Sequence, residues 1–574
     1  MKKNAIGSFD DDVGRGERKA GFTFYQTGAI AAMLVVAVWG LAVLLSLLVI
    51  PGSADRMELT YFGTLIIAYL VLAPLYWKRV RWGYVAGIVL VIGSFVGAGY
   101  AAWEGVLFFS WSAYNLSVII VYIIALTGLF FSYKSFRELP STRGKRPFLP
   151  LGGVVLILIV SGAAFWSNAE SIRASMLGNI DGKLQSLETL DEKIRFLMSK
   201  GNIPSLVAGI VVNDSLVWTG GYGADPNETV YQIASVTKPF VATAIMQLYE
   251  QNLIDLDADV NEYLPFSLRH PEYPDRPITI QMLLTHQSGL AHYTIQYRSY
   301  VEDEEILGWR SENLGWSVVR FDPYPSFAEF LEGYLTPGGP YHSPDAWSSS
   351  EPGTGFFYSS LGYDVLGYVV ERVTDQSFTD YLQGNILDPL NMTSIGFSVY
   401  DFPERQAAPH ERVYGVLSKC GVVKLPFYDR RLIGGGGMVS TVTDLTRFMI
   451  AHMNDGRIKG VQLLEPESVG LMHGRAVSFS TQGLWVGYGY GWIHHNDDPV
   501  RFIDMRGSQG HGGEDMGYQS SMWFVEEEQG GYGILLMSNI NESFKPNIVG
   551  VSTIYKKIEE LLLREASSMF SKNP

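Results

Sequence analysis

The residues of this chain with the clearest chemical potential are Ser235 and, three positions later, Lys238. A helical pattern begins here, and residues three apart lie on the same face of a helix. A serine hydroxyl is a weak nucleophile until a neighbouring group takes its proton. A lysine can take it if burial and nearby positive charge lower the pKa of its amine. The helix N-terminus adds positive potential where an oxyanion would develop, so the pair predicts covalent catalysis.

This spacing is weak when it stands alone, because Ser-x-x-Lys is expected by chance about once or twice in a chain of this length. Taken by itself, Ser235 is better explained as the N-cap of a helix than as a nucleophile. Two later stretches carry polar groups suited to the same chemistry: Tyr358-Ser359-Ser360 and His511-Gly512-Gly513. Taken singly, Tyr358 could be an amphipathic aromatic residue, Ser360 could bond locally, and His511 could be a satisfied surface histidine. The hypothesis depends on all of them occurring in order.

Residues from 180 to 565 resemble the serine β-lactamase and penicillin-binding-protein superfamily. The nearest branch is the class C β-lactamase-like group of DD-carboxypeptidases, esterases and D-amino-acid peptidases. The motifs that match are Ser235-Val236-Thr237-Lys238 for Ser-x-x-Lys, Tyr358-Ser359-Ser360 for Tyr-x-Asn, and His511-Gly512-Gly513 for Lys-Thr-Gly or His-x-Gly. Three further stretches match in order, namely residues 283–290, 386–392 and 436–441.

The resemblance implies a role for each motif residue. Ser235 would attack a carbonyl and become acylated, while Lys238 and Tyr358 share the proton transfers. The backbone N–H groups of Ser235 and Glu514 would form the oxyanion hole. Ser360, His511, Gly512 and Gly513 would line the substrate site, with His511 pairing with a substrate carboxylate or with Tyr358.

Two departures from the family pattern bear on the substrate. Ser360 stands where the family usually has asparagine, and His511 stands where true β-lactamases and transpeptidases have lysine. Both favour a peptidase or esterase over efficient antibiotic hydrolysis. The chain contains no His-Glu-x-x-His pattern, so we expect neither a metal nor a cofactor. The single cysteine, Cys420, lies in a turn-like stretch without a motif.

The elements expected to position these residues fall at both ends of the second half of the chain. The predicted elements are an amphipathic helix over 181–200, strands over 205–212 and 216–222 joined by a turn at Asn213-Asp214, a helix over 236–252, strands over 519–525 and 532–538, and a final helix over 553–570. Strands at both ends with helices between them predict one antiparallel sheet built from both termini. The fold class is therefore an α/β (α+β) β-lactamase/transpeptidase-like domain, an antiparallel sheet flanked by helices with a helical second lobe. Residues 293–355 are irregular and aromatic, and could form a surface excursion or a substrate-facing lid.

The first part of the chain predicts an α-helical transmembrane bundle. A bilayer core requires about 20 apolar residues in a helix. Five segments approach this length, namely 27–50, 60–77, 83–103, 114–133 and 149–166. Basic residues cluster before the first segment and in alternate loops, which predicts a cytoplasmic N-terminus and an extracytoplasmic domain after the fifth. No charged residue lies within the five segments, which favours a tether over a transporter or a lipid-binding role.

These observations predict a multi-pass protein of the cell membrane. Its parts are a cytoplasmic N-terminus (1–26), a transmembrane domain of about five helices (27–168), a linker (169–180) and a serine hydrolase domain (181–574). The expected partners are the lipid bilayer and a small-molecule or peptide substrate near it. A net charge of −15, carried mostly by the second half, argues against nucleic-acid binding. The alternative is a binding or sensor protein that deacylates slowly or not at all.

Overall fold

The computed structural model of the protein describes residues 177–291, 326–342, 344–413, 421–430, 432–481, 484–495, 504–528, 530–541 and 551–572. The chain divides into two units, Met1–Trp166 and Ser167–Pro574, and all described residues belong to the second. The five predicted membrane segments, the linker 169–176 and most of the irregular stretch 293–355 lie outside the described residues. Within the described ranges, no helix combines the length and the apolar character needed to cross a membrane.

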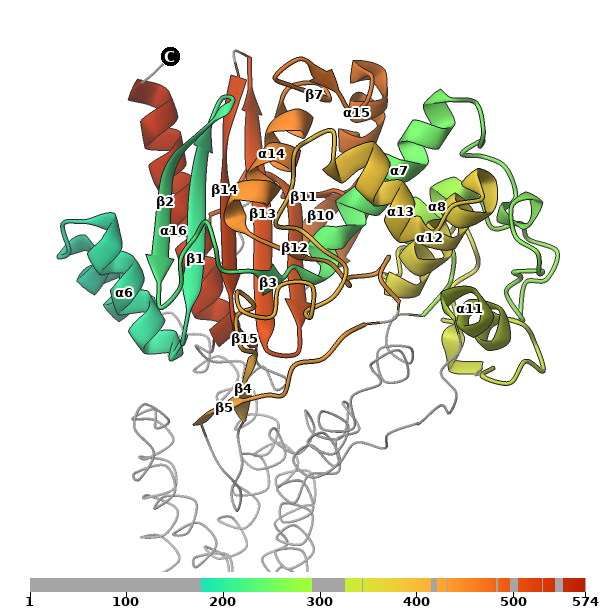
Figure 1. Ribbon diagram of the computed structural model, residues 1–574, viewed down its shortest axis with the longest axis horizontal. Helices are drawn as coiled ribbons and strands as arrows, with labels where there is room; N and C mark the ends of the chain where they lie inside the picture. Colours follow the sequence, from blue (N-terminus) through green and yellow to red (C-terminus); the bar gives the residue numbers. More distant parts are fainter. Residues whose placement is uncertain are drawn as a thin grey trace, which may run out of the picture. The chain divides into compact units, whose positions relative to one another are not determined.

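An antiparallel sheet of eight strands forms the centre of the described domain (Figure 1). Its order is β2-β1-β14-β13-β12-β11-β10-β9. The strands are β1 (Leu206–Val212), β2 (Ser215–Tyr222), β9 (Val477–Thr481), β10 (Leu484–Tyr488), β11 (Ile493–His495), β12 (Gln509–Asp515), β13 (Tyr518–Glu527) and β14 (Gly530–Ser538). β1 pairs with β14 along its whole length, so the two ends of the domain meet in one sheet as predicted.

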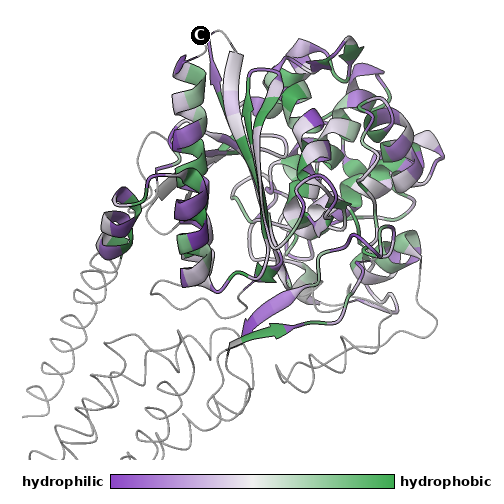
Figure 2. Ribbon diagram, turned by 60° about the vertical axis from the view of Figure 1, so that its left-hand side comes forward, coloured by the Kyte–Doolittle hydropathy of each residue, from purple (hydrophilic) through white to green (hydrophobic). Residues whose placement is uncertain are grey.

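The alternation of side chains along β1 explains why both faces of the sheet are covered. Val207 and Val211 point into one apolar cluster, whereas Leu206, Ala208 and Ile210 point into the other. Successive residues of a strand face opposite sides, so a strand that is apolar at every position needs a layer on each face. Figure 2 shows these two layers, with helix α16 on one side of the sheet and the larger helical group on the other.

The smaller layer consists of α6 (Leu190–Gly201) and α16 (Val551–Lys572), which pack on each other, and α16 also packs on β1 and β14. The sequence predicted one helix over 181–200, but the helix that begins in this region ends at residue 185 and α6 starts separately. Thr189 caps α6 by accepting the N–H of Glu192, and the Glu192 carboxylate accepts the N–H of Thr189. This reciprocal capping box favours a new helix start at a point where the apolar spacing alone continues.

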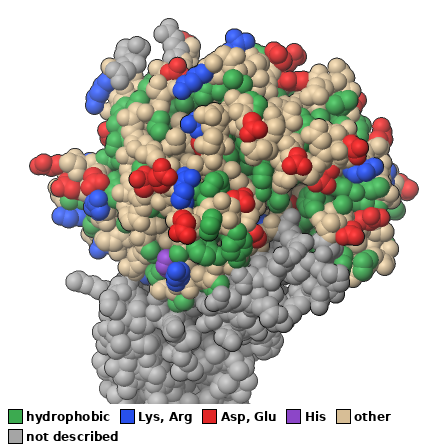
Figure 3. Space-filling model, viewed as in Figure 1, with side chains coloured by type: hydrophobic (Ala, Val, Ile, Leu, Met, Phe, Trp, Pro, Cys, Tyr) green, Lys and Arg blue, Asp and Glu red, His purple; other side chains and the backbone are tan. Residues whose placement is uncertain are grey.

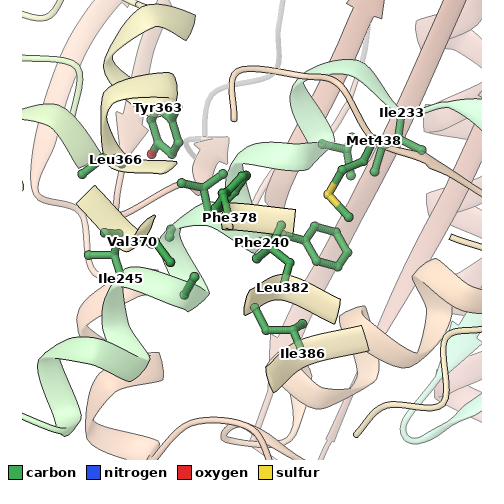
Figure 4. Close-up of a cluster of buried hydrophobic side chains, with 14 of the residues drawn as sticks. Ile233, Phe240, Ile245, Tyr363, Leu366, Val370, Phe378, Leu382, Ile386 and Met438 are labelled. Atoms are coloured by element: carbon green, nitrogen blue, oxygen red, sulfur yellow. The ribbon is translucent and has the colours of Figure 1, made fainter. Parts of the chain in front are cut away.

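The larger layer contains α7 (Lys238–Glu250), α12 (Ser360–Thr374), α13 (Phe378–Leu382) and α14 (Val442–Met453). Figure 4 shows where three of them meet: Phe240 of α7 lies among apolar side chains of α12, α13 and the residues just after α13. Phe240 also stacks on Phe448 of α14, with ring centroids 3.8 Å apart. This shared core fixes the start of α7 relative to the start of α12, and both starts carry predicted site residues, Lys238 and Ser360.

The remaining elements connect these layers. They are β3 (Tyr231–Gln232), η1 (Ala234–Thr237), η2 (Val260–Glu262), α8 (Ile280–Leu284), α11 (Phe327–Leu335), η3 (Pro344–Ala346), η4 (Gln383–Leu387), β4 (His410–Val413), β5 (Gly421–Lys424), β6 (Val439–Ser440), β7 (Arg457–Ile458), β8 (Val461–Gln462), α15 (Pro466–His473) and β15 (Ile540–Asn541). β3 pairs with β6, which places the segment just before Ser235 beside the one that follows the glycine run 434–437.

Candidate active site

Ser235 lies in the short helical turn η1, directly before α7, and it is the only residue of η1 that is not buried. The preceding residue, Ala234, has φ of +47°, a left-handed conformation that costs a non-glycine residue of order 1 kcal/mol or more. Ile233 holds this turn in place, because its N–H donates to the carbonyl of Met438 (2.9 Å) and its carbonyl accepts the hydroxyl of Ser520 (2.5 Å). The turn therefore presents the hydroxyl of Ser235 from a braced backbone.

Lys238 is fully buried one helical turn beyond Ser235, and its amine has three neighbours. Nζ lies 2.9 Å from Oγ of Ser235, 3.1 Å from Oγ of Ser360 and 2.6 Å from the carbonyl oxygen of Gly435. A neutral lysine amine keeps two hydrogens and one lone pair. With Ser360 and Gly435 accepting the two hydrogens, the lone pair is directed at the Ser235 hydroxyl.

The surroundings of Lys238 favour its neutral form. Burial, and then the positive charge of Arg430, lower the pKa of its amine well below the usual value, while Asp364 and Asp515 act in the opposite direction. A base must be unprotonated to accept a proton, and an ordinary lysine is not unprotonated at neutral pH. The structure thus supplies the condition that the Ser235–Lys238 pair needs.

Tyr358 is hydrogen-bonded to Ser235, and Nζ of Lys238 lies 4.9 Å from the centroid of its ring. Burial raises the pKa of Tyr358 well above its usual value, against weaker opposing effects of the Ser235 hydrogen bond and Arg430. Its phenol is therefore neutral over the physiological range and can act as a proton donor. The three predicted catalytic residues are brought together around one hydroxyl.

Strand β12 supplies the wall that faces η1. β11 pairs with β12 only at Gln509 and Gly510, so within the described residues the edge from His511 onward is not covered by a neighbouring strand. A Cβ added to Gly513 would collide with the carbonyl of Ile233 and the hydroxyl of Ser520, and would lie 3.1 Å from the backbone N of Ser235. Only glycine permits this approach, which brings the Ser235 amide and the segment leading to Glu514 side by side.

His511 lies on the same strand but is buried, with 1% of its surface exposed. Its Nδ1 is 2.6 Å from the carbonyl oxygen of Gly512, which can only accept, so Nδ1 carries the proton. Nε2 then accepts from the hydroxyl of Tyr488 at 3.2 Å. Burial, followed by the charge of Lys238, lowers the pKa of His511 to about 3. The ring is neutral and both nitrogens are engaged by the protein, an arrangement unsuited to pairing with a substrate carboxylate.

The part of the chain that matches a known family contains the whole site. Residues 190–550 match the family model described as Beta-lactamase. The chain belongs to the β-lactamase family. This match includes every motif residue discussed above, from Ser235 to Glu514.

Protein flp of Staphylococcus aureus strain N315 is 26% identical over 374 residues, which cover 63% of this chain and 65% of that protein. The human mitochondrial serine beta-lactamase-like protein LACTB is 26% identical over 345 residues, 50% of this chain and 62% of its own length. The chain thus spans somewhat less than two thirds of these relatives. Among solved structures, the octameric penicillin-binding protein homologue from Pyrococcus abyssi has a TM-score of 0.49 at 23% identity, covering 64% of this chain and 75% of that one.

Several residues of this β-lactamase-family site were not predicted. Arg430 and Asp515 form an ion pair of 3.1 Å whose side chains are 2% and 1% exposed. Asp364 is buried and accepts the N–H of Gly435 at 2.8 Å. One signal was present in the sequence, since Asp364 follows Ser360 by one helical turn on the predicted helix. No sequence spacing links Asp364 or Asp515 to Arg430, and only the fold brings Arg430 near each of them.

The remaining predicted residues have defined places. Ser360 is buried at the start of α12 and contacts Lys238, while Gly512 is half-buried and Glu514 exposed on β12. Glu514 acts on Tyr358 electrostatically and raises its pKa further. Among the described residues of this β-lactamase-family domain, no group of three His, Cys, Asp or Glu side chains is placed to hold a metal ion. Cys420 lies outside the described residues.

Proposed function

We propose that the protein is a serine hydrolase that cleaves an amide or ester through an acyl-enzyme on Ser235, as a peptidase or esterase. The observation that carries this proposal is the 2.9 Å contact between Nζ of Lys238 and Oγ of Ser235, made by a fully buried amine. A nucleophile in contact with a base whose pKa is lowered is the arrangement that covalent acyl transfer requires.

The acylation step follows from the hydrogen-bond count at Lys238. The lone pair of the neutral amine takes the proton of Ser235 as Oγ bonds to the substrate carbon, and the carbonyl electrons move to the oxygen. The resulting ammonium has three donors, and Ser235, Ser360 and Gly435 are the three acceptors within reach. The protonated base is thereby stabilised at the moment when it forms.

The oxyanion and the leaving group require two further contributions. The backbone N–H groups of Ser235 and Glu514 would stabilise the oxyanion, because Gly513 lets β12 approach the turn that carries Ser235. Tyr358, neutral and hydrogen-bonded to Ser235, is placed to relay this proton: its hydroxyl gives a proton to the departing amine or alcohol and takes up the one held by Lys238. A water then attacks the acyl carbon and gives one proton to the neutral amine of Lys238, and that proton passes to Oγ of Ser235 as the acyl bond breaks.

The substrate proposed is a small molecule or peptide met outside the cell membrane. The membrane part of this proposal depends on the five apolar segments of the sequence and on their basic loops. Hydrolysis of a substrate recognised by its carboxylate is disfavoured, because His511 is neutral and its nitrogens are both occupied.

In Figure 3, acidic side chains are spread over the visible face of the described domain, in keeping with the acidic character of the sequence.

The test is labelling of the full-length protein with a fluorophosphonate probe and a penicillin analogue, with the adduct located by mass spectrometry. We expect an adduct on Ser235 in the wild type and none in Ser235→Ala. Ser199→Ala, which alters an exposed serine of α6, is the matched control and should label as the wild type does. Equal labelling of wild type and Ser235→Ala would overturn the proposal.

Deacylation separates an enzyme from a receptor on the same scaffold. A hydrolase releases the acyl group of ester and peptide substrates and turns over repeatedly. An adduct on Ser235 that forms with every substrate and never hydrolyses would instead establish the protein as a binding or sensor module. Substrate turnover by the same preparation, measured beside the labelling, decides between the two.

A further inference from the structure

Three buried charged residues act electrostatically on the amine of Lys238. Asp364, Arg430 and Asp515 have 0%, 4% and 4% of their surface exposed. Burying a charged group costs free energy unless an opposite charge or hydrogen bonds stabilise it, so each of these groups needs a partner. Arg430 and Asp515 pair with each other at 3.1 Å. Asp364 is the other carboxyl group of the three, and it raises the pKa of Lys238.

A direct structural path joins Asp364 to the lysine through Gly435. Oδ1 of Asp364 accepts the N–H of Gly435 at 2.8 Å, and the carbonyl of the same glycine accepts a hydrogen from Nζ of Lys238 at 2.6 Å. The two bonds anchor the peptide groups on either side of one α-carbon, so Asp364 holds the residue whose carbonyl accepts from Lys238. A Cβ on Gly435 would lie 2.7 Å from Cβ of Ser360, which shows how closely this residue is pressed against α12.

Arg430 also lies against the glycine run. A Cβ on the next residue, Gly436, would lie 2.6 Å from Nη1 of Arg430. The segment that carries the Gly435 carbonyl is therefore in contact with both the carboxyl group of Asp364 and the guanidinium of Arg430. One negative and one positive group thus act on the same amine.

We propose that Asp364 is a positioning residue that holds the Gly435 carbonyl on Lys238 and supplies the counter-charge for its ammonium form, and that Arg430 opposes it by favouring the neutral amine. This inference rests on the proposed function of Lys238 as the base for Ser235. When the proton passes from Ser235 to Lys238, a carboxylate at Asp364 stabilises the new charge, whereas Arg430 ensures that the amine is unprotonated beforehand.

The electrostatics of the groups agree with this division. Arg430 lowers the pKa of Lys238, second only to burial, and Asp364 raises it. Burial raises the pKa of Asp364 itself to about 6, opposed by Arg430, the Gly435 N–H and Lys238. Asp515 also raises the pKa of Lys238. The remaining titratable groups that face Lys238 are Tyr358, Tyr363 and His511, whose shifted pKa values keep all three neutral near pH 7. Lys238 and Asp364 each affect the protonation of the other.

The experiment measures the rate of acylation of Ser235 against pH in the full-length protein, with a fluorophosphonate of fixed concentration. Asp364→Asn keeps an oxygen for the Gly435 N–H and removes only the charge. We expect it to move the acidic limb of the profile to lower pH by roughly one unit, because the ammonium form loses its counter-charge. The plateau rate should fall about tenfold, since a lysine of lower pKa is a weaker base. Asp364→Ala removes the acceptor as well and should lose more of the plateau.

Arg430→Met gives the opposite shift. Without the guanidinium the ammonium form gains stability, so the acidic limb should move to higher pH, and Arg430→Lys should restore it towards the wild type. If the two substitutions shift the acidic limb in opposite directions, the two residues act electrostatically. Loss of structure would instead lower the rate without moving the acidic limb of the pH profile. If Arg430→Met does not fold, Asp364→Asn decides alone. Asp444→Asn, a buried carboxyl group on α14 that contacts Ser394 and Arg447, is the matched control and should leave the limb in place.

Two results would overturn the inference. One is an acidic limb that stays in place in Asp364→Asn, and the other is a shift in the same direction for Asp364→Asn and Arg430→Met. Both outcomes leave the Ser235 adduct intact and refute only the roles of Asp364 and Arg430. Absence of any adduct in the wild type would instead refute the proposed function.

Discussion

The imidazole of His286 lies against the ring of Tyr358, with the two ring centroids 4.3 Å apart. Its Nδ1 accepts the N–H of Ser359 at 3.1 Å, and its carbonyl accepts the N–H of Phe357 at 2.8 Å. His286 thus contacts the residues on both sides of Tyr358 as well as its ring. His286 belongs to the stretch 283–290 that matches the family in sequence, and this contact shows what His286 positions: the phenol that hydrogen-bonds Ser235.

Replacing His286 should therefore impair catalysis without touching the reacting groups. We expect His286→Ala to lower the acylation rate of Ser235 on the order of tenfold to a hundredfold, because Tyr358 loses both its ring contact and its backbone support. His286→Asn should retain more activity, since asparagine accepts a hydrogen bond and tolerates the φ of +58° found here. Labelling rates of the two variants, compared at equal folded fraction by circular dichroism, check this. Equal rates in His286→Ala and wild type would contradict it.

Ser360 occupies the position where the family usually has asparagine, and here it accepts a hydrogen from Lys238 at 3.1 Å. Ser360→Ala removes one of the two acceptors that direct the lysine lone pair at Ser235. We expect acylation to slow by about tenfold, which corresponds to roughly 1.4 kcal/mol in the barrier. Ser359→Ala is the neighbouring control. The hydroxyl of Ser359 caps α12 by accepting the N–H of Gly362. Its loss in Ser359→Ala should therefore mainly lower the stability of the protein.

Measuring the acylation rate of Ser360→Ala as a function of pH separates a loss of orientation from a change in the basicity of Lys238. Loss of a neutral acceptor should lower the rate across the profile and leave the acidic limb near its wild-type position. A limb displaced as far as in Asp364→Asn would show that Ser360 acts on the charge of Lys238 and would contradict a purely directional role.

The sheet and the first motif were accessible from the sequence because both depend on local spacing. β1 and the paired strands β13 and β14 are runs of apolar residues bounded by turns, and the predicted hairpin turn at Asn213 has the positive φ typical of such turns. Ser235 and Lys238 are one helical turn apart whatever the rest of the chain does. Such features need no knowledge of distant contacts.

The rest of the site depends on contacts between segments far apart in the chain. Asp364 and Gly435 meet across 71 positions, and Arg430 and Asp515 across 85. No periodic pattern records which buried carboxyl group meets which carbonyl. The same holds for β9 and β10, short strands that join the sheet by pairing with each other and with β11 and that the sequence pattern did not predict. The buried charges beneath Lys238 are visible only once the fold is known.

A second site of pH sensitivity lies away from the catalytic residues, at His494 of β11. Burial, together with the charges of His473 and Arg475, lowers the pKa of His494 to about 4, and Glu526 acts in the opposite direction. An unfolded histidine titrates near pH 6.5, so between about pH 6.5 and about pH 4 the unfolded chain binds a proton that the folded one does not. Folding stability should therefore fall as the pH falls through this window, by about 1.4 kcal/mol per pH unit for this group.

His494→Phe retains a ring of similar size and cannot titrate. We expect the urea concentration at half-unfolding to drop less between about pH 7 and about pH 5 in this variant than in the wild type. Tryptophan fluorescence of the full-length protein supplies the measurement. Wild type and His494→Phe are compared at each pH. Identical drops in both proteins would show that His494 does not carry the effect.

Adjacent glycines of β12 should differ strongly in their response to the same substitution. A Cβ on Gly513 would collide with the carbonyl of Ile233 and the hydroxyl of Ser520, both of which are held by the fold. A Cβ on Gly512 would meet nothing closer than Trp523 at 3.6 Å, an ordinary van der Waals contact. We expect Gly513→Ala to push β12 away from η1, separating the Ser235 amide from the strand that completes the oxyanion hole.

The loss in Gly513→Ala should be large, on the order of a hundredfold or more in the acylation rate, because an oxyanion-hole donor is displaced. Gly512→Ala should lose far less, since the added methyl fits without movement of the backbone. Fluorophosphonate labelling of the two variants measured side by side tests this, with thermal unfolding to confirm that each is folded. Similar losses in both variants would mean that the close approach of β12 to Ser235 does not control the reaction.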